Sequence, residues 1–231
     1  MIIPFVLLLI AAYLLGSVPT AYLVARWRRG IDIRRFGSGN IGASNVLASG
    51  SRWTSLIVIG FDFLKGVAPV VVSRAVNLPV YQQAAIGIAA ICGHNWTVFL
   101  RFSGGRGVLT TLGVVFALAP WLALALLIIN FAFAPFKQFA LGTLLVLVLL
   151  PVFSWYLADP FGIQRSTQLS LGFAAILVLL LVRRLTAPRS ELAATVSARE
   201  LVVHRLLFDR DIKDRKLWLS RRASEANGGA K

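Results

Sequence analysis

The sequence predicts an all-α fold: a polytopic membrane bundle of about seven transmembrane helices, with the N-terminus outside and the C-terminus in the cytoplasm. Three observations lead to this fold class. Of the 231 residues, 58% are hydrophobic, and the mean hydropathy is +0.78, whereas a soluble domain has roughly 45–50% apolar residues. Several apolar runs approach or exceed the ~20 residues that cross a bilayer core. Basic side chains gather at the ends of these runs and indicate the cytoplasmic side.

Six apolar runs fill most of residues 1–184, the expected transmembrane domain. They span residues 2–25, 53–73, 84–100, 107–136, 138–158 and 169–182. The first run is too long, and is followed by too many others, to be a cleaved signal peptide. Pro120 lies near the middle of the fourth run, where proline can end a helix. That run therefore has the length and the break for two short helices.

Positive charge predicts the orientation. Arginines follow the first run within residues 26–35, the third run at Arg101 and Arg106, and the last run at Arg183. Since cytoplasmic loops carry an excess of Lys and Arg, all three regions should face the cytoplasm. Returning to the same side after Arg106 takes an even number of crossings, so a break at Pro120 gives seven, with residues 159–165 outside. A single kinked helix there is the alternative, which gives six crossings and puts the tail outside.

The remaining chain is expected to form a cytoplasmic tail. Residues 185–222 are charged and amphipathic, and Ser197 and Glu200 have the spacing of a capping box that opens a helix. A surface-lying helix without chemistry is also compatible with this segment, and Trp218 suits the membrane interface. The polar end, residues 223–231, is expected to be disordered.

A glycine-rich cationic loop, Arg-Phe-Ser-Gly-Gly-Arg-Gly-Val at residues 101–108, separates the third and fourth runs. Glycines let backbone N–H groups converge on an anion, and the following helix directs its positive end to the same point. Arg106 can place two N–H donors on phosphate oxygens. The loop therefore predicts phosphate binding at a membrane surface. Its candidate residues are Ser103, Gly104, Gly105, Arg106 and Gly107.

The first cytoplasmic loop, residues 30–45, is dense in glycine and small polar side chains. Hydroxyl and amide groups suit the oxygens of a phosphate or a glycerol. An ordinary Asx-rich connection between helices would have a similar composition. The candidate residues are Ser38, Asn40, Ser44 and Asn45.

Several polar side chains lie close to these loops or within the apolar runs. His94 and Asn95 directly precede the glycine-rich loop, and His94 is either a catalytic group or a hydrogen-bonded interfacial histidine. Asp62 and Lys65 lie three residues apart, near one face of a helix. They form either a structural ion pair, or a site in which Lys65 adds a counter-charge for phosphate.

Other function classes lack support. Cys92 is the one cysteine, so it has no partner for an intrachain disulfide, and the sequence has no metal-ligand cluster and no nucleotide-binding glycine pattern in context. We therefore expect no cofactor and no metal. The net charge of +15 is spread over loop ends that face anionic lipid headgroups, without interleaved aromatic residues. Membrane lipids account for it better than nucleic acid.

Together these segments resemble the bacterial acyl-phosphate:glycerol-3-phosphate acyltransferases, which are small integral membrane enzymes. The match runs through residues 16–22, 37–45, 62–66 and 93–108, in the family's order and spacing. The resemblance implies acyl transfer from acyl phosphate to the 1-hydroxyl of glycerol 3-phosphate, in the bacterial inner membrane with the site facing the cytoplasm. It implies no CoA thioester, acyl carrier protein or metal. Catalytic roles fall to Ser38, His94 and Asn45, and substrate binding falls to Asn40, Ser44, Lys65, Asn95, Ser103, Gly104, Gly105, Arg106 and Gly107.

The chain departs from the family pattern at cationic positions and in its third motif. Family members usually have arginine at the position of Ala48 and lysine at that of Ser103, and Arg52 is a candidate substitute for the first. The third motif, H-x-x-N-I-x-R-L-x-x-G-x-E, loses its asparagine and its glycine in the segment that begins at Arg199. One alternative is therefore an impaired paralogue that binds phosphorylated lipid precursors without turnover. Another is a transporter of phosphorylated anions, although the sequence has no evident inverted repeat.

Overall fold

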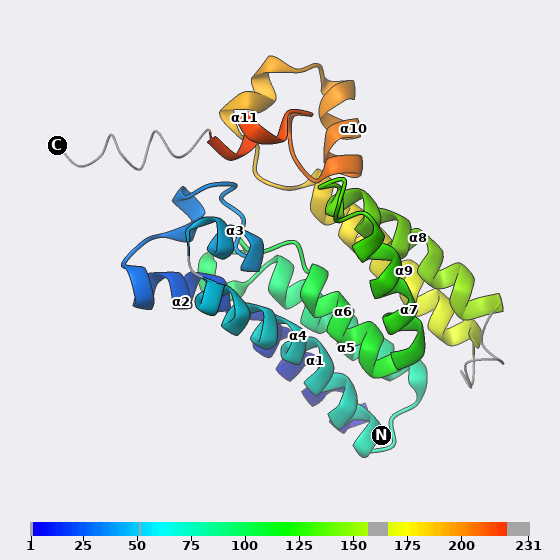
Figure 1. Ribbon diagram of the computed structural model, residues 1–231. Helices are drawn as coiled ribbons and strands as arrows, with labels where there is room; N and C mark the ends of the chain where they lie inside the picture. The colour runs from blue at the N-terminus through cyan, green and yellow to red at the C-terminus, as the bar shows by residue number, and fades with distance from the viewer. Residues whose placement is uncertain (1, 51, 157–165, 221–231) are drawn as a thin grey trace.

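The computed structural model describes residues 2–50, 52–156 and 166–220, and these residues form helices and connections without any β-strand (Figure 1). The longer helices of the bundle, within the described residues, are α1 (Ile2–Ser17), α4 (Arg52–Ala75), α5 (Val80–Asn95), α6 (Val108–Leu118), α7 (Pro120–Ala132), α8 (Phe139–Tyr156) and α9 (Ser166–Leu185). Shorter elements are α2 (Thr20–Arg29), η1 (Ile33–Arg35), α3 (Ala43–Ala48), η2 (Val98–Leu100), η3 (Glu191–Thr195), α10 (Ala198–Phe208) and α11 (Arg215–Ser220). The all-α prediction is confirmed.

Length and composition mark this bundle as a membrane fold. Among the described residues, four helical stretches are long and apolar enough to cross a bilayer, namely Ile2–Arg29, Arg52–Ala75, Phe139–Tyr156 and Thr167–Leu185. The helices Val108–Leu118 and Pro120–Ala132 are apolar but shorter. Large apolar side chains on the outer surface are exposed, as lipid-facing side chains are.

The fourth apolar run is divided at Pro120, as predicted. α6 ends at Leu118, and α7 begins with Pro120 in its first turn, where the missing N–H costs no helical hydrogen bond. α7 then runs back toward the end of the bundle where α6 begins (Figure 1). The connection to α8 accordingly brings Lys137 to the same hollow as Arg106.

The first run is also divided, which the sequence analysis did not anticipate. α1 ends at Ser17 and α2 begins at Thr20, with Pro19 as its N-cap residue. Proline removes a backbone donor and clashes with the preceding turn, so it ends the helix here. α2 lies beside α3 at the end of the bundle opposite the N-terminus (Figure 1).

Glycines allow two helix pairs to pack backbone against backbone. A Cβ atom on Gly16 or Gly93 would collide with the facing backbone of α5 or α1. Gly66 and Gly113 form the same kind of contact between α4 and α6. Small residues permit such close helix packing in membrane proteins. These contacts fix the end of α5 and the start of α6, between which the glycine-rich loop lies.

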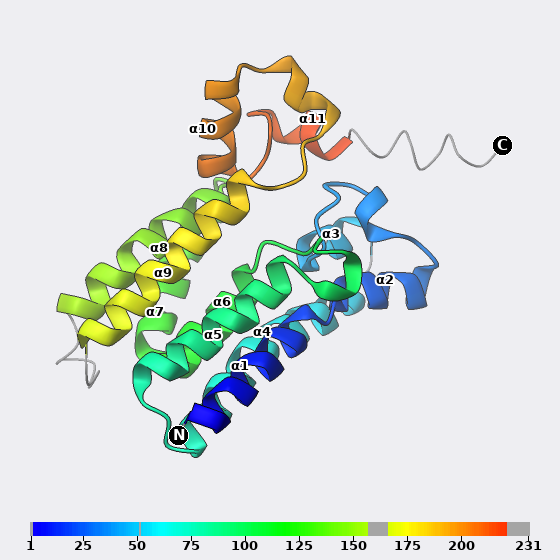
Figure 2. The same cartoon turned by 180° about the vertical axis from the view of Figure 1, so that it is seen from behind.

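The C-terminal segment, residues 197–220, packs over one end of the bundle (Figure 2). The predicted capping box is confirmed, since Ser197 and Glu200 satisfy each other's backbone N–H groups at the start of α10. Arg184 ties α9 to this segment and to α8 through the carbonyls of Leu206 and Ala140. Trp218 of this segment is buried within the protein, so its side chain is not free to lie at a membrane interface. The expectations for residues 159–165 and 223–231 lie outside the described residues.

Candidate active site

Asn45 organises the first cytoplasmic loop. Its side chain is 2% exposed, and its Oδ1 accepts a hydrogen bond from the backbone N–H of Ser38 at 3.1 Å. Its Nδ2 lies 3.0, 2.9 and 3.1 Å from the carbonyl oxygens of Ile33, Phe36 and Asn40. These bonds turn the amide toward the loop backbone, so Asn45 fixes the shape of the loop that presents Ser38.

The glycine turn, residues 103–107, packs directly onto the C-terminal end of α5. The N–H of Gly105 donates to the carbonyl of His94 at 3.0 Å. A Cβ atom on Gly104 would overlap the His94 and Asn95 backbone, and one on Gly105 would overlap the His94 ring. Gly107 has a φ of 72° and would bring a Cβ within 2.5 Å of the Asn95 Oδ1. Glycine is therefore required here by close approach and by a left-handed backbone.

Arg183 holds the other side of the glycine turn, and the sequence analysis used it only for topology. Its Nε and Nη2 donate to the carbonyls of Gly105 and Gly104 at 2.8 and 2.7 Å. The guanidinium lies 5.6 Å from the ring centre of Trp96. The signal that could have revealed this role is an arginine at the end of an apolar run, where a buried charge needs partners.

This arrangement refines the predicted anion site. The N–H of Gly105 is committed to His94, so it does not point at a ligand. Among the described residues, no acceptor meets the backbone N–H groups of Gly104, Arg106 or Gly107. Gly104 and Arg106 line a polar hollow, so their N–H groups are candidate donors to an anion, whereas Gly107 lines neither hollow.

Two hollows flank Arg106 on the side where the two loops meet. The first hollow has a volume of about 210 Å³ and is lined by cations and hydroxyl groups, among them Arg34, Ser103, Arg106 and Arg183. The second hollow has a volume of about 290 Å³, and its lining includes Ser44, Ala48, Arg106, Lys137, Arg210 and Arg215. Ser38, Asn40, Arg106 and Trp218 line both hollows. Ser38 and Arg106, candidate residues from two different loops, therefore line the same polar hollows.

Two carboxylates partly neutralise the positive charge around the hollows. Asp32 accepts hydrogen bonds from Arg34 at 2.6 to 3.2 Å, and the Arg34 hydrogen bond lowers the pKa of that carboxyl below its usual value. Asp209 lies 3.1 Å from Arg106. It ends α10 with a φ of 55°, a conformation that glycine adopts more readily.

The position of Asp209 also clarifies the third motif. When Arg205 and Leu206 are aligned with the Arg-Leu pair of the third motif, Asp209 takes the position of the motif's glycine. Asp211 then takes the position of its glutamate. Asp211 accepts a hydrogen bond from Arg205 at 2.8 Å and two from Ser190. The second half of the motif therefore has a carboxylate, that of Asp211, at the glutamate position. The sequence analysis did not identify this similarity.

Other sequence-predicted residues lie beneath the glycine turn. Lys65 forms an ion pair with Asp62 at 2.8 Å and donates to the carbonyl of Val18 at 3.2 Å. The Nδ1 of His94 lies 3.7 Å from the same Asp62 carboxylate. A small cavity of about 10 Å³ is lined by these side chains together with Gly104 and Gly105. Lys65 and His94 therefore face the underside of the turn and line neither hollow.

Asn95 lies at the same depth. It is fully buried behind Gly107, and neither atom of its amide has a hydrogen-bond partner among the described residues. It contributes to the packing of the turn and lines neither hollow.

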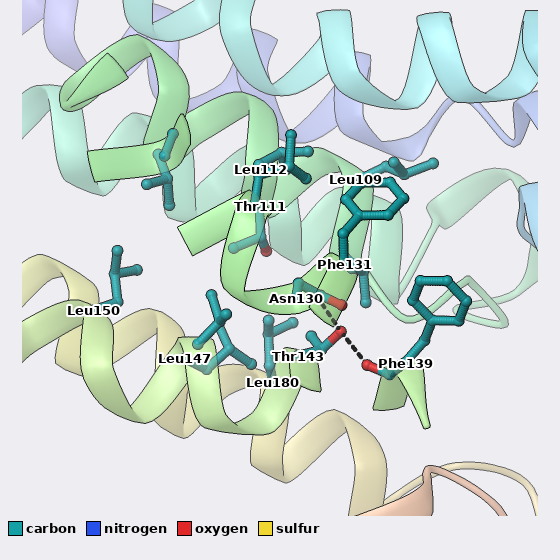
Figure 3. Close-up of a pocket in the computed structure, with 15 residues that line it drawn as sticks. Leu109, Thr111, Leu112, Asn130, Phe131, Phe139, Thr143, Leu147, Leu150 and Leu180 are labelled. Atoms are coloured by element: carbon teal, nitrogen blue, oxygen red, sulfur yellow. Dashed lines mark hydrogen bonds between the residues drawn. The ribbon is translucent and has the colours of Figure 1, made fainter. Parts of the chain in front are cut away.

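An apolar cavity of about 240 Å³ lies between α6, α7, α8 and α9 (Figure 3). Its lining is mostly apolar and includes leucines such as Leu112, Leu147 and Leu150. Asn130 donates to the Thr143 hydroxyl at 3.0 Å, which in turn donates to the carbonyl of Phe139 at 2.8 Å. Phe139 also lines the second hollow, so a polar site and an apolar site adjoin at this residue.

The family model described as "Glycerol-3-phosphate acyltransferase" matches residues 6–194, which is most of the chain. The chain belongs to this family. The resemblance noted from the sequence is thereby confirmed. The matched segment of the acyltransferase ends before α10, so Asp209, Arg210, Arg215 and Trp218 lie beyond it.

Relatives of this acyltransferase match over nearly its whole length. It is 46% identical over 222 residues to glycerol-3-phosphate acyltransferase 5 of Dehalococcoides mccartyi strain ATCC BAA-2266, covering 96% of this chain and 95% of the relative. It is 45% identical over 225 residues to glycerol-3-phosphate acyltransferase 4 of D. mccartyi strain CBDB1, covering 97% of each chain. The glycerol 3-phosphate form of PlsY (YgiH), an integral membrane glycerol 3-phosphate acyltransferase, is similar in structure, with a TM-score of 0.69 and 30% identity over 78% of this chain and 88% of that chain.

Proposed function

We propose that this acyltransferase moves a fatty acyl group from acyl phosphate to the 1-hydroxyl of glycerol 3-phosphate, yielding lysophosphatidic acid and inorganic phosphate. The observation that carries the proposal is the pair of hollows that share Ser38, Asn40 and Arg106. Two phosphorylated substrates need two neighbouring anion sites, and one of them needs an apolar extension. The related PlsY structures include a glycerol 3-phosphate form and a lysophosphatidic acid form, which supports this acceptor and this product.

The two hollows suit different substrates. The second hollow adjoins the apolar cavity at Phe139, so it fits the phosphate of the donor while the acyl chain lies among the leucines. The first hollow is polar and holds Arg34 and Arg183, so it fits glycerol 3-phosphate. In this arrangement the reacting groups meet at Ser38 and Arg106, which line both sites.

The chemistry needs orientation and charge stabilisation. The hydroxyl oxygen of glycerol 3-phosphate bonds to the acyl carbonyl carbon, the bond from that carbon to the phosphate oxygen breaks, and the hydroxyl proton ends on the released phosphate. Acyl phosphate is an activated mixed anhydride, so holding the two substrates in contact supplies much of the rate. Arg106 and the free N–H groups of the glycine turn stabilise the departing phosphate.

The candidate residues then divide by role. Ser38, Asn40, Ser44, Ser103 and Arg106 bind substrate, since they line the hollows. Asn45 acts through the first loop, because its amide bonds to that loop's backbone. His94, Asn95 and Lys65 act through the glycine turn, which packs on them.

We further propose seven membrane crossings, with the hollows on the cytoplasmic side of a bacterial inner membrane. The return of α7 to the end that holds Arg106 and the grouping of arginines at that end support this topology. Fusing a cytoplasm-active fluorescent reporter and a periplasm-active phosphatase to the C-terminus tests it. Fluorescence with an inactive phosphatase is the expected result, and the reverse contradicts seven crossings.

The function itself is tested with detergent-purified protein, palmitoyl phosphate and glycerol 3-phosphate. We expect equal release of inorganic phosphate and lysophosphatidic acid, including in the presence of a metal chelator, and no turnover in the Ser38→Ala variant. Folded wild-type protein that binds both substrates without product would instead identify the impaired paralogue. Loss of turnover on chelation would contradict a metal-free reaction.

A further inference from the structure

The second hollow carries an excess of positive charge that the glycine turn does not supply. Four of its lining side chains are cationic, namely Arg106, Lys137, Arg210 and Arg215, and Asp209 is the one carboxylate among the described lining residues. Asp209 pairs with Arg106. Within the described part of the chain, no salt bridge neutralises the other three cations.

Arg210 is held at this hollow with unused hydrogen-bonding capacity. Its guanidinium carbon lies 5.1 Å from the ring centre of Phe208, which fixes the side chain against the end of α10. Its Nε is buried and has no hydrogen-bond partner among the described residues. Burial and then the charge of Arg215 lower the pKa of Arg210, and the charge of Asp214 offsets these effects only in part.

The backbone that presents these arginines is anchored. Asp211, next to Arg210, accepts hydrogen bonds from Arg205 and from Ser190 at 2.7 to 2.8 Å. Arg205 also donates to the carbonyl of Leu185 at 2.6 Å, which ties the segment to the end of α9. A guanidinium held like that of Arg210 loses little entropy on binding a phosphate, and Arg215 lines the same hollow from an exposed position at the start of α11.

We propose that Arg210 and Arg215, together with Lys137, bind the phosphate of the acyl donor, so that the C-terminal segment beyond the family match completes the donor site. This inference rests on the proposed function. A doubly charged phosphate at the second hollow offsets the three unpaired cations, and Phe139 links that position to the apolar cavity. The segment that the sequence analysis treated as a charged tail is then part of the substrate site.

The test compares Arg210→Gln and Arg215→Gln with two matched control variants. Arg199→Gln and Lys213→Gln remove a positive charge from exposed positions of the same segment that line neither hollow. Two quantities are measured for each variant. One is the KM for palmitoyl phosphate and for glycerol 3-phosphate. The other is the Kd of an unreactive acyl phosphonate of the same chain length, obtained by calorimetry.

Each site variant should raise the KM for palmitoyl phosphate and the phosphonate Kd roughly tenfold, as loss of a charged hydrogen bond does. The KM for glycerol 3-phosphate should change less than about twofold, and the control variants should behave as wild type. Wild-type values in both site variants, with an unchanged melting temperature, would overturn the proposal. So would a rise confined to glycerol 3-phosphate, or no phosphonate binding by the wild type. Arginine-dependent phosphonate binding without any turnover would uphold the site and refute the proposed function alone.

Discussion

The glycine turn and the C-terminal segment reach the same hollow by different physical means. The turn is shaped by backbone contact, since Gly104 and Gly105 leave no room for a Cβ atom against α5. The C-terminal segment is held by ion pairs and hydrogen bonds such as Arg205 to Asp211, and its functional side chains are long and cationic. Changes in the turn should therefore remove catalysis outright, whereas changes in the segment should adjust affinity or local stability.

The largest effect is expected at Gly105. In Gly105→Ala the new methyl group would lie 2.6 Å from the Ile41 carbonyl oxygen and overlap the His94 ring. The turn must then move, and we expect kcat to fall roughly a thousandfold. Phosphate release measures this. The control is Gly60→Ala in α4, where a Cβ meets no atom within 4 Å. Equal activity of the two variants would show that the turn tolerates a side chain.

The second-largest effect is expected for Asn45→Asp, which should lower kcat/KM roughly a hundredfold. The substitution keeps the acceptor for Ser38 but replaces the Nδ2 donor with an oxygen that faces three carbonyls. The melting temperature should fall as well. The exposed residue Leu47 on the same helix provides the control variant Leu47→Ala. If Asn45→Asp retains both activity and stability, the amide does not shape the loop.

Arg183→Gln should reduce kcat roughly thirtyfold, because the carbonyls of Gly104 and Gly105 lose a charged donor. Arg183→Lys, which keeps the charge but not the fork of donors, should recover part of the rate. Steady-state kinetics with both substrates distinguish this effect from a simple loss of charge. Wild-type kinetics in Arg183→Lys, together with the loss in Arg183→Gln, would show that charge alone matters.

The C-terminal segment should respond to acid through Asp211. The pKa of this carboxyl lies below its usual value although burial raises it, because Ser190 and Arg205 donate hydrogen bonds to its charged form. A lowered folded-state pKa stabilises the fold above the unfolded value of about 3.9, and that stability is lost as the pH falls further. Hydrogen exchange of α10 should therefore quicken below about pH 4 in the wild type. In Asp211→Asn the exchange should already be fast at neutral pH, and an unchanged profile would contradict this account.

The smallest effect is expected at Ser197, which caps α10 with Glu200. Ser197→Ala should destabilise this helix by about 1 kcal/mol. Acyl transfer should change less than about twofold, because the segment keeps its other anchors at Asp211 and Arg184. Hydrogen exchange and phosphate release measure the two quantities. A large loss of activity would mean that the start of α10, rather than its end, controls the site.

The features that could be predicted from the sequence are those that depend on neighbouring residues, and the missed features depend on contacts across the fold. The break at Pro120 and the capping box at Ser197 follow from local chemistry, so the sequence analysis found them. The roles of Arg183 and Asp209 depend on contacts between residues far apart in the chain, which single-sequence patterns do not encode. The break at Pro19 was missed because an unbroken apolar run concealed the proline.

The candidate residues lie on both sides of the glycine turn, some lining the hollows and others packed beneath the turn. Polar residues near a glycine-rich turn can face a ligand or support the turn from behind, and the sequence does not distinguish the two. Arg106 faces the hollows, whereas His94 and Lys65 face the small cavity. Which side a residue takes depends on helix packing at Gly66, Gly93 and Gly113, which emerges only in three dimensions.

The most direct test of the account is two-substrate kinetics of Arg106→Gln, because this arginine lines both hollows. The exposed Arg101 of the same loop provides the matched control, Arg101→Gln. We predict that Arg106→Gln raises the KM for palmitoyl phosphate and for glycerol 3-phosphate roughly tenfold each, while Arg101→Gln changes neither. A rise in only one of the two KM values, or in neither, would contradict a shared site for two phosphates.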